Sequence, residues 1–364
     1  MPGALRHRSV DSRSTTLDLL RALAVLWVIA GHALIVAIRP TGVIGELLDP
    51  IHAVGLFFAV SGYLVTRSLL GDGSRVSRAR LAGAILRRWI RLALPHGAAV
   101  LLFSLPLIST LIAAIGWEIA IPANPRQWLS LLTLFGAWTP LPDPVLGLLT
   151  VPISIVVIGN WSISAEWFAA LLVIPYAALR LRSPRAIAVA ATLVGLLFSW
   201  SSLSGGGVHW ALFHLPAFLV GVWAARAGAP ISQHRGDLAV MLIGALLCLS
   251  TGLLSRSGSL VPGIELLWGV MIALLLARPM PLRSVLWEPL FWLGSRSYGA
   301  YLFHMIGLAW SYSIAQTHLD GISLWLAIFS GGLLAAVLGG AVTGELLERP
   351  AIAIGRRLAR KIGG

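Results

Sequence analysis

Long apolar runs recur along the whole chain, and they constrain its fold more than any other feature. A helix needs about 20 mostly apolar residues to cross a bilayer, and about ten runs meet that condition. They cover residues 17–38, 51–70, 92–115, 161–179, 186–203, 208–225, 238–255, 260–277, 289–312 and 322–347. Charged residues make up only 11% of the chain, against about 25% in a soluble domain. The sequence therefore predicts an all-α protein, a polytopic bundle of transmembrane helices. It excludes a soluble globular enzyme, a disordered chain and a disulfide scaffold.

Basic residues lie mainly between the apolar runs, and their distribution predicts an orientation. With the N-terminus inside, 22 of the 27 Lys and Arg residues fall in inner segments and three in outer ones. Cytoplasmic loops of membrane proteins carry such an excess. We therefore expect both termini in the cytoplasm, with a cytoplasmic N-terminal tail at 1–16, a transmembrane domain at 17–348 and a basic C-terminal tail at 349–364.

The segment at 116–160 does not fit this pattern. It holds two shorter apolar pieces, 128–138 and 145–158, which are broken or flanked by prolines. Each piece is too short to span, so we expect outer-face or re-entrant elements there.

The predominance of arginine over lysine indicates the kind of genome that encodes the chain and the membrane in which it lies. Lys361 is the one lysine, and the other basic residues are arginines. With abundant Ala, Gly and Leu, this usage is typical of a GC-rich bacterial genome, so we expect the bacterial inner membrane. A nucleic-acid-binding protein needs a solvated basic face. Short arginine clusters between apolar runs instead predict membrane lipids as partners. We therefore expect no nucleic-acid partner.

Two ionisable residues lie inside the first apolar run, where such side chains cost several kcal/mol. Arg21 and His32 are 11 residues apart. This is close to three helical turns, so both lie on one helix face, at roughly 16 Å from each other. An anionic ligand could dock at Arg21 while its reactive end reaches His32. The alternatives are that Arg21 snorkels to the inner headgroups and that His32 caps a neighbouring helix.

The second run and the loop after it supply further candidates. Ser61 and Tyr63 lie near mid-depth, within reach of the level of His32; ordinary small-residue packing is the alternative for Ser61. Arg87, Arg88 and Arg91 fit one helical turn on the cytoplasmic side, and guanidinium groups suit phosphates. Positive-inside topology and attraction to anionic lipids explain part of this cluster.

Two later residues fall near the depth of His32. Glu166 lies about five residues inside the fourth run, and His304 about 15 residues into the ninth. A carboxylate beside an imidazole fixes its tautomer and raises its basicity, so we expect Glu166 to orient His32. Neither histidine has a second ligand at i+3 or i+4, so we expect no metal site.

Taken together, these motifs resemble the acyltransferase-3 family of bacterial integral membrane O-acyltransferases. The family pattern of a basic residue and a histidine in the first span matches Arg21 and His32. Five further patterns follow in the family's order. They match Phe57, Phe58, Ser61, Gly62 and Tyr63; Arg88 and Arg91; Trp161, Ser162, Ser164 and Glu166; Ser297, Tyr298, Tyr301, Leu302 and His304; and Glu348 and Pro350.

The resemblance implies transfer of an acyl group, usually acetyl, from acyl-CoA to a hydroxyl, usually on a sugar. Acyl-CoA would be a co-substrate, with no tightly bound cofactor. The catalytic residues would be His32, as general base, with Glu166, Tyr63 and Ser61. A covalent acyl-Ser61 or acyl-His32 intermediate is an open alternative. The donor would contact Arg21, Arg87, Arg88, Arg91 and Tyr298. The acceptor would contact Trp161, Ser162, Tyr301 and His304.

Two departures from the pattern concern the substrate contacts. Pro95 follows Arg91 by four residues, where the pattern has three. The residues after Glu166 are Trp167 and Phe168, in place of a second acidic or amide residue and an aromatic pair.

Two other classes of function stay open at this stage. A secondary transporter for an anionic or acylated metabolite also has many spans and buried ionisable residues, but usually shows repeated halves, and the sequence shows none. A non-catalytic acyl-CoA sensor would need Arg21 and not His32. The acceptor is open too: a lipopolysaccharide, exopolysaccharide or peptidoglycan sugar, or a glycosylated natural product.

Overall fold

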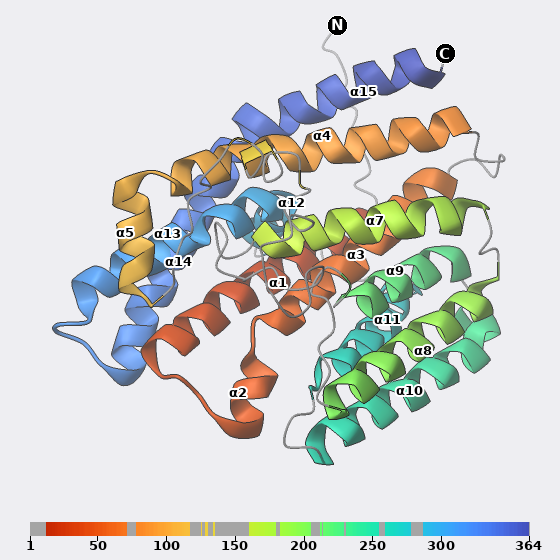
Figure 1. Ribbon diagram of the computed structural model, residues 1–364, viewed down its shortest axis with the longest axis horizontal. Coiled ribbons are helices and arrows are strands. Elements are labelled where there is room, and N and C mark those ends of the chain that lie inside the picture. Colours follow the sequence, from red (N-terminus) through yellow and green to blue (C-terminus); the bar gives the residue numbers. More distant parts are fainter. Residues whose placement is uncertain are drawn as a thin grey trace, which may run out of the picture.

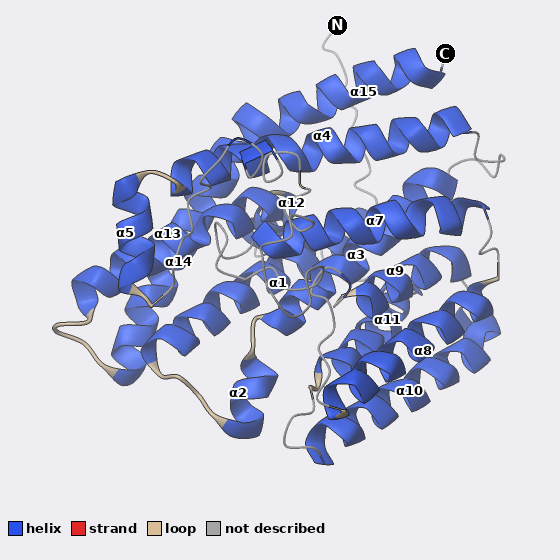
Figure 2. Cartoon of the chain, in the orientation of Figure 1, coloured by secondary structure: helices blue, strands red, loops and turns tan. Residues whose placement is uncertain are grey.

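The computed structural model of the chain describes residues 12–70, 78–116, 125, 128–129, 134, 160–179, 183–204, 212, 214–228, 231–254, 259–277 and 287–363. Within these residues every regular element is a helix (Figures 1 and 2). The helices are α1 (Ser12–Ala37), α2 (Gly42–Leu48), α3 (Ile51–Leu70), α4 (Arg78–Phe103), α5 (Pro106–Ala114), α7 (Asn160–Leu179), α8 (Pro184–Leu203), α9 (Leu215–Ala227), α10 (Arg235–Leu254), α11 (Val261–Ala277), α12 (Glu288–Ser295), α13 (Ser297–Ala315), α14 (Gly321–Thr343) and α15 (Arg349–Gly363). The predicted all-α class is confirmed for the described part of the chain.

Helices long and apolar enough to cross a membrane occur five times among the described residues. They are Thr15–Ala37, Gly42–Leu70, Pro184–Leu203, Ser232–Leu253 and Gly321–Lys361. Three shorter apolar helices, at Ser162–Leu172, Leu215–Ala227 and Val261–Leu276, coincide with further predicted runs. The structure therefore supports a helical membrane protein, while the count of about ten spans stays a prediction. Most of 116–160 lies outside the described residues.

Two predicted spans are wrong as single helices. The run 92–115 is divided between α4 and α5, which are bent by 82° at a break before Pro106. Proline starts a helix readily but cannot continue one, since it lacks the N–H group. The run 289–312 is divided between α12 and α13 at Arg296. Here Gly294 lies against the backbone of α1: an added Cβ atom would lie 1.7 Å from the carbonyl oxygen of Asp18.

Helices α1 and α3 lie in the middle of the bundle and separate two groups of helices (Figure 1). On one side α9 and α11 pack against α3, with α8 and α10 outside them. On the other side α12, α13 and α14 pack against α1. Each side has its own cluster of buried apolar side chains. The space enclosed between α1, α3 and their neighbours is therefore at the junction of the two groups.

Helices α3 and α9 cross at two glycines, so their backbones touch. A Cβ atom added to Gly62 would lie 2.2 Å from the carbonyl oxygen of Phe218, and one added to Gly221 would lie 1.9 Å from that of Ala59. Close approach through small residues is a common way to pack helices in a membrane. The contact fixes the rotation of α3 and so the direction in which Ser61 points.

This crossing gives a prediction on stability. Gly221→Ala should lower the apparent Tm of the detergent-solubilised protein, because the new methyl overpacks the crossing at a cost of about 1–3 kcal/mol. Gly236→Ala on α10 is the matched control, since a Cβ atom there meets nothing within 4 Å. Equal Tm values for the two variants would contradict the described crossing.

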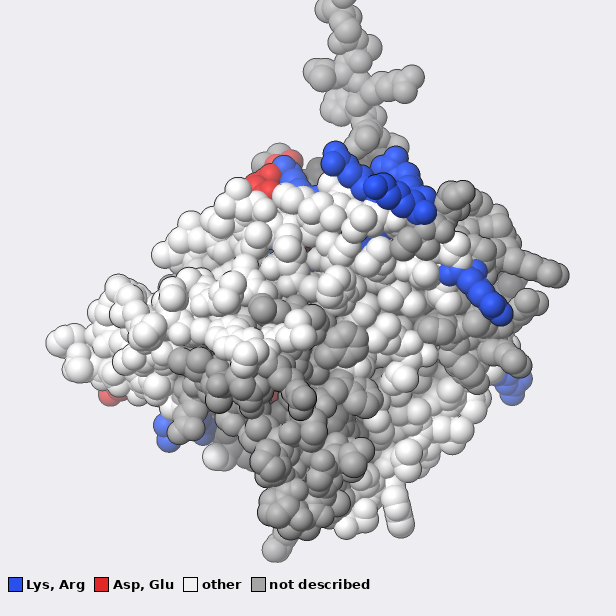
Figure 3. All heavy atoms as spheres, turned by 45° about the horizontal axis from the view of Figure 1, so that its top comes forward, with Lys and Arg blue, Asp and Glu red and all other residues white. Residues whose placement is uncertain are grey.

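Helices α4 and α15 lie side by side and antiparallel along one face of the molecule, which we call the α4–α15 face (Figure 1). They meet through small residues: added Cβ atoms on Gly83 and Gly355 would lie 3.2 Å from the Cβ atom of Ala359 and the Cα atom of Arg87. Lys and Arg side chains gather on this face (Figure 3). The segment predicted as a basic tail thus folds as a helix that covers the bundle.

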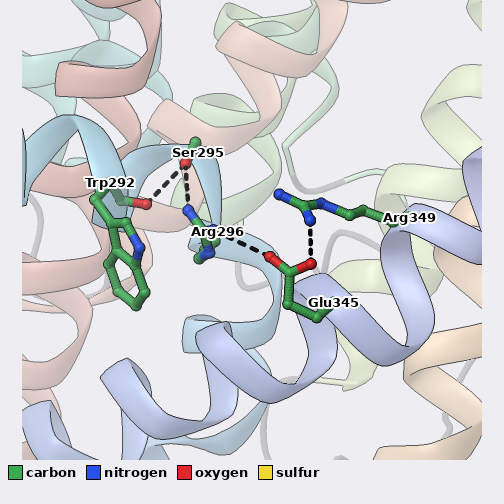
Figure 4. A network of polar contacts seen from close by, with 5 residues as sticks. All are labelled: Trp292, Ser295, Arg296, Glu345 and Arg349. Atoms are coloured by element: carbon green, nitrogen blue, oxygen red, sulfur yellow. Dashed lines mark hydrogen bonds and ion pairs between the residues drawn. The ribbon is translucent and has the colours of Figure 1, made fainter.

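A polar network joins the start of α15 to the break between α12 and α13 (Figure 4). Arg296 stacks over the Trp292 ring at 4.6 Å and donates to Glu345 at 3.3 Å, while Arg349 also pairs with Glu345. Ser295 accepts from Arg296 at 3.4 Å. Glu345 belongs to a π-helical turn, Gly344–Glu348, between α14 and α15. The network fixes this turn, and with it Glu348.

Candidate functional site

A cavity of about 450 Å³ lies between α1, α3, α4, α7, α13 and α15. Ligand pockets typically measure about 300–1,000 Å³. Apolar side chains, most of them from α3, form part of its wall, and charged and hydroxyl groups form the rest. The charged and hydroxyl-bearing residues are Arg21, Arg87, Arg88, Arg91, Arg356, Glu166, Glu348, Ser61, Ser68, Ser162, Ser295, Ser297, Tyr298 and Tyr301. The cavity therefore combines an excess of cationic side chains with an apolar wall.

The arginines predicted to bind an anion lie together in this cavity. Arg21 comes from α1 and lies 3.7 Å from Asp18 on the same helix. Arg87, Arg88 and Arg91 come from about one turn of α4, as their spacing predicts. Arg21 thus lines the cavity together with the arginines of α4.

Two further cavity residues were not predicted as site residues. Arg356 of α15 adds a fifth arginine among the described lining residues, and Glu348 of the π-helical turn adds a second carboxylate. Glu348 was visible in the sequence as part of the last motif. Arg356 looked like one of many basic residues of a terminal segment, and only the return of α15 over α4 places it here.

Glu166 is bound to Arg88 and Ser61, and the predicted pairing of Glu166 with His32 is wrong. Ser61 Oγ donates to Glu166 Oε1 at 2.6 Å, and Arg88 Nη2 contacts both oxygens. The side chains of Arg88 and Glu166 are only 16% and 20% exposed. A guanidinium held this far from water needs a countercharge, and the carboxylate on the facing turn of α7 supplies it. This cluster joins α3, α4 and α7.

His32 of α1 is paired with His304 of α13. His32 Nδ1 and His304 Nε2 are 3.0 Å apart, and the two rings lie nearly parallel, with centroids 5.2 Å apart. His304 Nδ1 lies 2.6 Å from the carbonyl oxygen of Tyr301. The predicted common depth of the two histidines is therefore met. His304 touches His32, and its predicted contact with the acceptor stays a prediction.

The histidine pair lies just beyond the cavity and does not line it. Tyr301, which lines the cavity, has its ring centroid 5.7 Å from that of His304. The Tyr301 hydroxyl is 2.8 Å from Ser162 Oγ, and the Phe57 ring packs edge-on against Tyr301. Tyr301 and Ser162 thus close the end of the cavity that faces the histidines.

Of the remaining predicted site residues, one lines the cavity, one lies outside it and one has a side chain that the structure does not describe. Tyr298 lines the cavity, and its hydroxyl donates to the carbonyl oxygen of Leu92 at 2.7 Å, so it bridges α13 and α4. Tyr63 does not line the cavity; it lies two residues beyond Ser61 and packs in the apolar core near α9. Two residues turn a helix by about 200°, which explains why both side chains cannot face one space. Trp161 lies in α7, and its side chain is outside what the structure describes.

A second buried polar contact lies just outside the cavity, where the His214 ring packs on the cavity-lining residue Phe58 with centroids 4.8 Å apart. His214, just before α9, pairs with Glu265 of α11, and both side chains are fully buried. Neither lines the cavity. The contact joins α9 to α11 inside the group of helices that supports α3.

Comparison with known proteins assigns the chain to one family. The model of the Acyl_transf_3 family, described as an acyltransferase domain, matches residues 15–343, nearly the whole chain. No curated protein and no solved structure matches. The matched range includes Arg21, His32, Arg88, Glu166 and His304, whereas α15 lies beyond it.

Proposed function

The chain belongs to the acyltransferase-3 family, and we propose that it is a membrane O-acyltransferase using acyl-CoA from the cytoplasm. It transfers an acyl group, most simply acetyl, to a hydroxyl of a carbohydrate or a glycosylated acceptor. One observation carries the proposal: a cavity lined by five arginines among its described residues ends at Tyr301, which contacts the histidine pair. We place the α4–α15 face at the cytoplasmic side of a bacterial inner membrane, supported by the positive-inside rule.

The cavity suits the donor by charge and shape. CoA carries several phosphate charges on its nucleotide end, and arginines bind phosphate oxygens with paired N–H groups. Its pantetheine arm is long, thin and only moderately polar, which fits the apolar wall from Val54, Phe57 and Phe58. Bound this way, the nucleotide stays at the arginines while the thioester points toward Tyr301.

The chemistry requires a base near the thioester carbonyl. His32 takes the proton of the acceptor hydroxyl while the hydroxyl oxygen forms a bond to the carbonyl carbon of the thioester. The carbon–sulfur bond then breaks, and the thiolate takes the proton from His32 and leaves as CoA. General-base assistance of this kind accelerates a reaction by about 10²–10⁴-fold. The Tyr301–Ser162 hydroxyl pair must part for the thioester to meet the base.

Purified protein tests this function directly. In detergent, where transport cannot be observed, we expect release of free CoA thiol from acetyl-CoA when a panel of glycan and glycoside acceptors is added. A transporter would give no acceptor-dependent thiol, and a sensor would bind acetyl-CoA without turning it over. Absence of acceptor-dependent thiol across the panel, with intact acetyl-CoA binding, would contradict the proposal.

Arg356 gives a more specific prediction about the donor site. Arg356→Gln should raise the KM for acetyl-CoA by roughly three- to tenfold, because the lost phosphate contact is partly exposed to solvent. Arg357→Gln is the matched control, since Arg357 is exposed on the same helix and does not line the cavity. The effect should shrink at high ionic strength. Equal KM values for the two variants would remove Arg356 from the donor site.

A further inference from the structure

The distances from the ring nitrogens of the histidine pair to their partners are sufficient to assign the protons of the pair. His304 Nδ1 lies 2.6 Å from the backbone carbonyl oxygen of Tyr301. A carbonyl oxygen only accepts hydrogen bonds, so this nitrogen carries a hydrogen. In a neutral imidazole the other ring nitrogen then has a lone pair and accepts. His304 Nε2 is therefore the acceptor side of the ring.

A neutral His304 is the state that fits its surroundings. Its side chain is 1% exposed in the middle of α13, and a cation in such a place is costly. The carboxylate that the sequence placed nearby, Glu166, is already held by Arg88 and Ser61. His304 instead packs against the Tyr301 ring and the His32 ring.

The hydrogen bond between the two rings then has a defined donor and a defined acceptor. His32 Nδ1 lies 3.0 Å from His304 Nε2, so His32 Nδ1 must be the donor. In a neutral ring, His32 Nε2 then carries the lone pair that can accept a proton. The two rings are inclined to each other by only 11°.

We infer that His304 is a positioning residue that holds His32 in the tautomer whose Nε2 acts as the base. The inference rests on the proposed function for the role of His32, and it deepens that role. When Nε2 takes a proton, the positive charge on His32 is stabilised through its Nδ1–H bond to His304, whose Nδ1–H bond ends on the Tyr301 carbonyl. Each bond in such a chain strengthens the next. Thus a neutral imidazole performs the orientation that a carboxylate performs in a Ser-His-Asp triad.

Two substitutions at one position separate positioning from acceptor binding. His304→Asn keeps an amide N–H near the position of Nδ1 but removes the acceptor for His32. His304→Gln carries a carbonyl oxygen out to the position of Nε2. We expect His304→Asn to lower kcat by about 10- to 100-fold with an unchanged KM for the acceptor. His304→Gln should restore kcat to within a few-fold of the wild type.

A contact with the acceptor substrate would produce the opposite pattern. Both variants would then raise the acceptor KM and leave kcat nearly unchanged. That result, or an equal loss of kcat in the Asn and Gln variants with normal membrane insertion, would overturn the inference.

Nitrogen-15 NMR of histidine-labelled protein in lipid bilayers tests the tautomer without any substrate. We expect His32 to show a protonated Nδ1 and an unprotonated Nε2, with the His32→Ala spectrum giving the assignment. In His304→Asn the proton should move to Nε2. A wild-type His32 protonated at Nε2 would overturn the inference even if acyl transfer is normal. Loss of the proposed function would appear separately, as wild-type protein inactive toward acetyl-CoA.

Discussion

Replacing His32 with alanine should lower kcat for acyl transfer by about 10²–10⁴-fold, the range expected for loss of a general base. The KM for acetyl-CoA should stay near the wild-type value, because the arginines that would hold the phosphates line the cavity and His32 does not. The measurement is steady-state release of CoA thiol by purified protein, with acetyl-CoA and acceptor varied in turn.

The control for this variant is His318→Ala. His318 is exposed, three residues past the end of α13, and is not part of the cavity. It should have wild-type kinetics, which excludes a general effect of removing a histidine. A His32→Ala protein that inserts normally and retains near wild-type kcat would remove His32 from the mechanism.

Arg88 should prove the most costly arginine to remove, for two reasons that can be separated. Arg88→Met leaves Glu166 without its countercharge in a site that is mostly closed to water. Breaking a buried pair in this way costs up to about 3–5 kcal/mol, so we expect a large fall in apparent Tm. We also expect a rise in the KM for acetyl-CoA of about 10- to 100-fold, the value of one charge-assisted phosphate contact.

The double variant Arg88→Met/Glu166→Gln isolates the binding effect. Removing both charges should restore much of the lost Tm, since no unpaired carboxylate remains. The raised KM should persist. S-acetylpantetheine, which lacks the phosphates, should show the same KM with the wild type and the double variant. A KM for acetyl-CoA that returns to the wild-type value together with Tm would mean that Arg88 stabilises the fold and does not bind the donor.

Most of the helices could be predicted from the sequence because each is a long apolar run. The second run, 51–70, coincides with α3, since Pro50 and the polar residues after Leu70 limit it on both sides. The two failures have local causes. Pro106 bends the third run, and at Gly294 α12 approaches the backbone of α1 closely before the chain turns at Arg296.

The sequence predicted which residues belong to the candidate site better than it predicted which of them contact each other. Depth along a helix is readable from residue number, so the common level of His32 and His304 could be predicted. The direction of a side chain around the helix, relative to helices far away in sequence, could not. Glu166 was therefore paired with His32 although it contacts Arg88 and Ser61, and Tyr63 was predicted as a site residue although it does not line the cavity. Arg356 was missed because an amphipathic terminal helix and a solvated tail have the same basic residues.

The central claim is that a donor enters between the arginines and brings its acyl carbon to the histidine pair. A cryo-EM structure with a non-reactive thioether analogue of acetyl-CoA tests it most directly. We predict the phosphates at Arg21, Arg88 and Arg91, the pantetheine arm along α3, Tyr301 separated from Ser162, and the acyl end beside His32. An analogue bound outside this cavity, or an acyl end still separated from His32 by a closed Tyr301, would contradict the account.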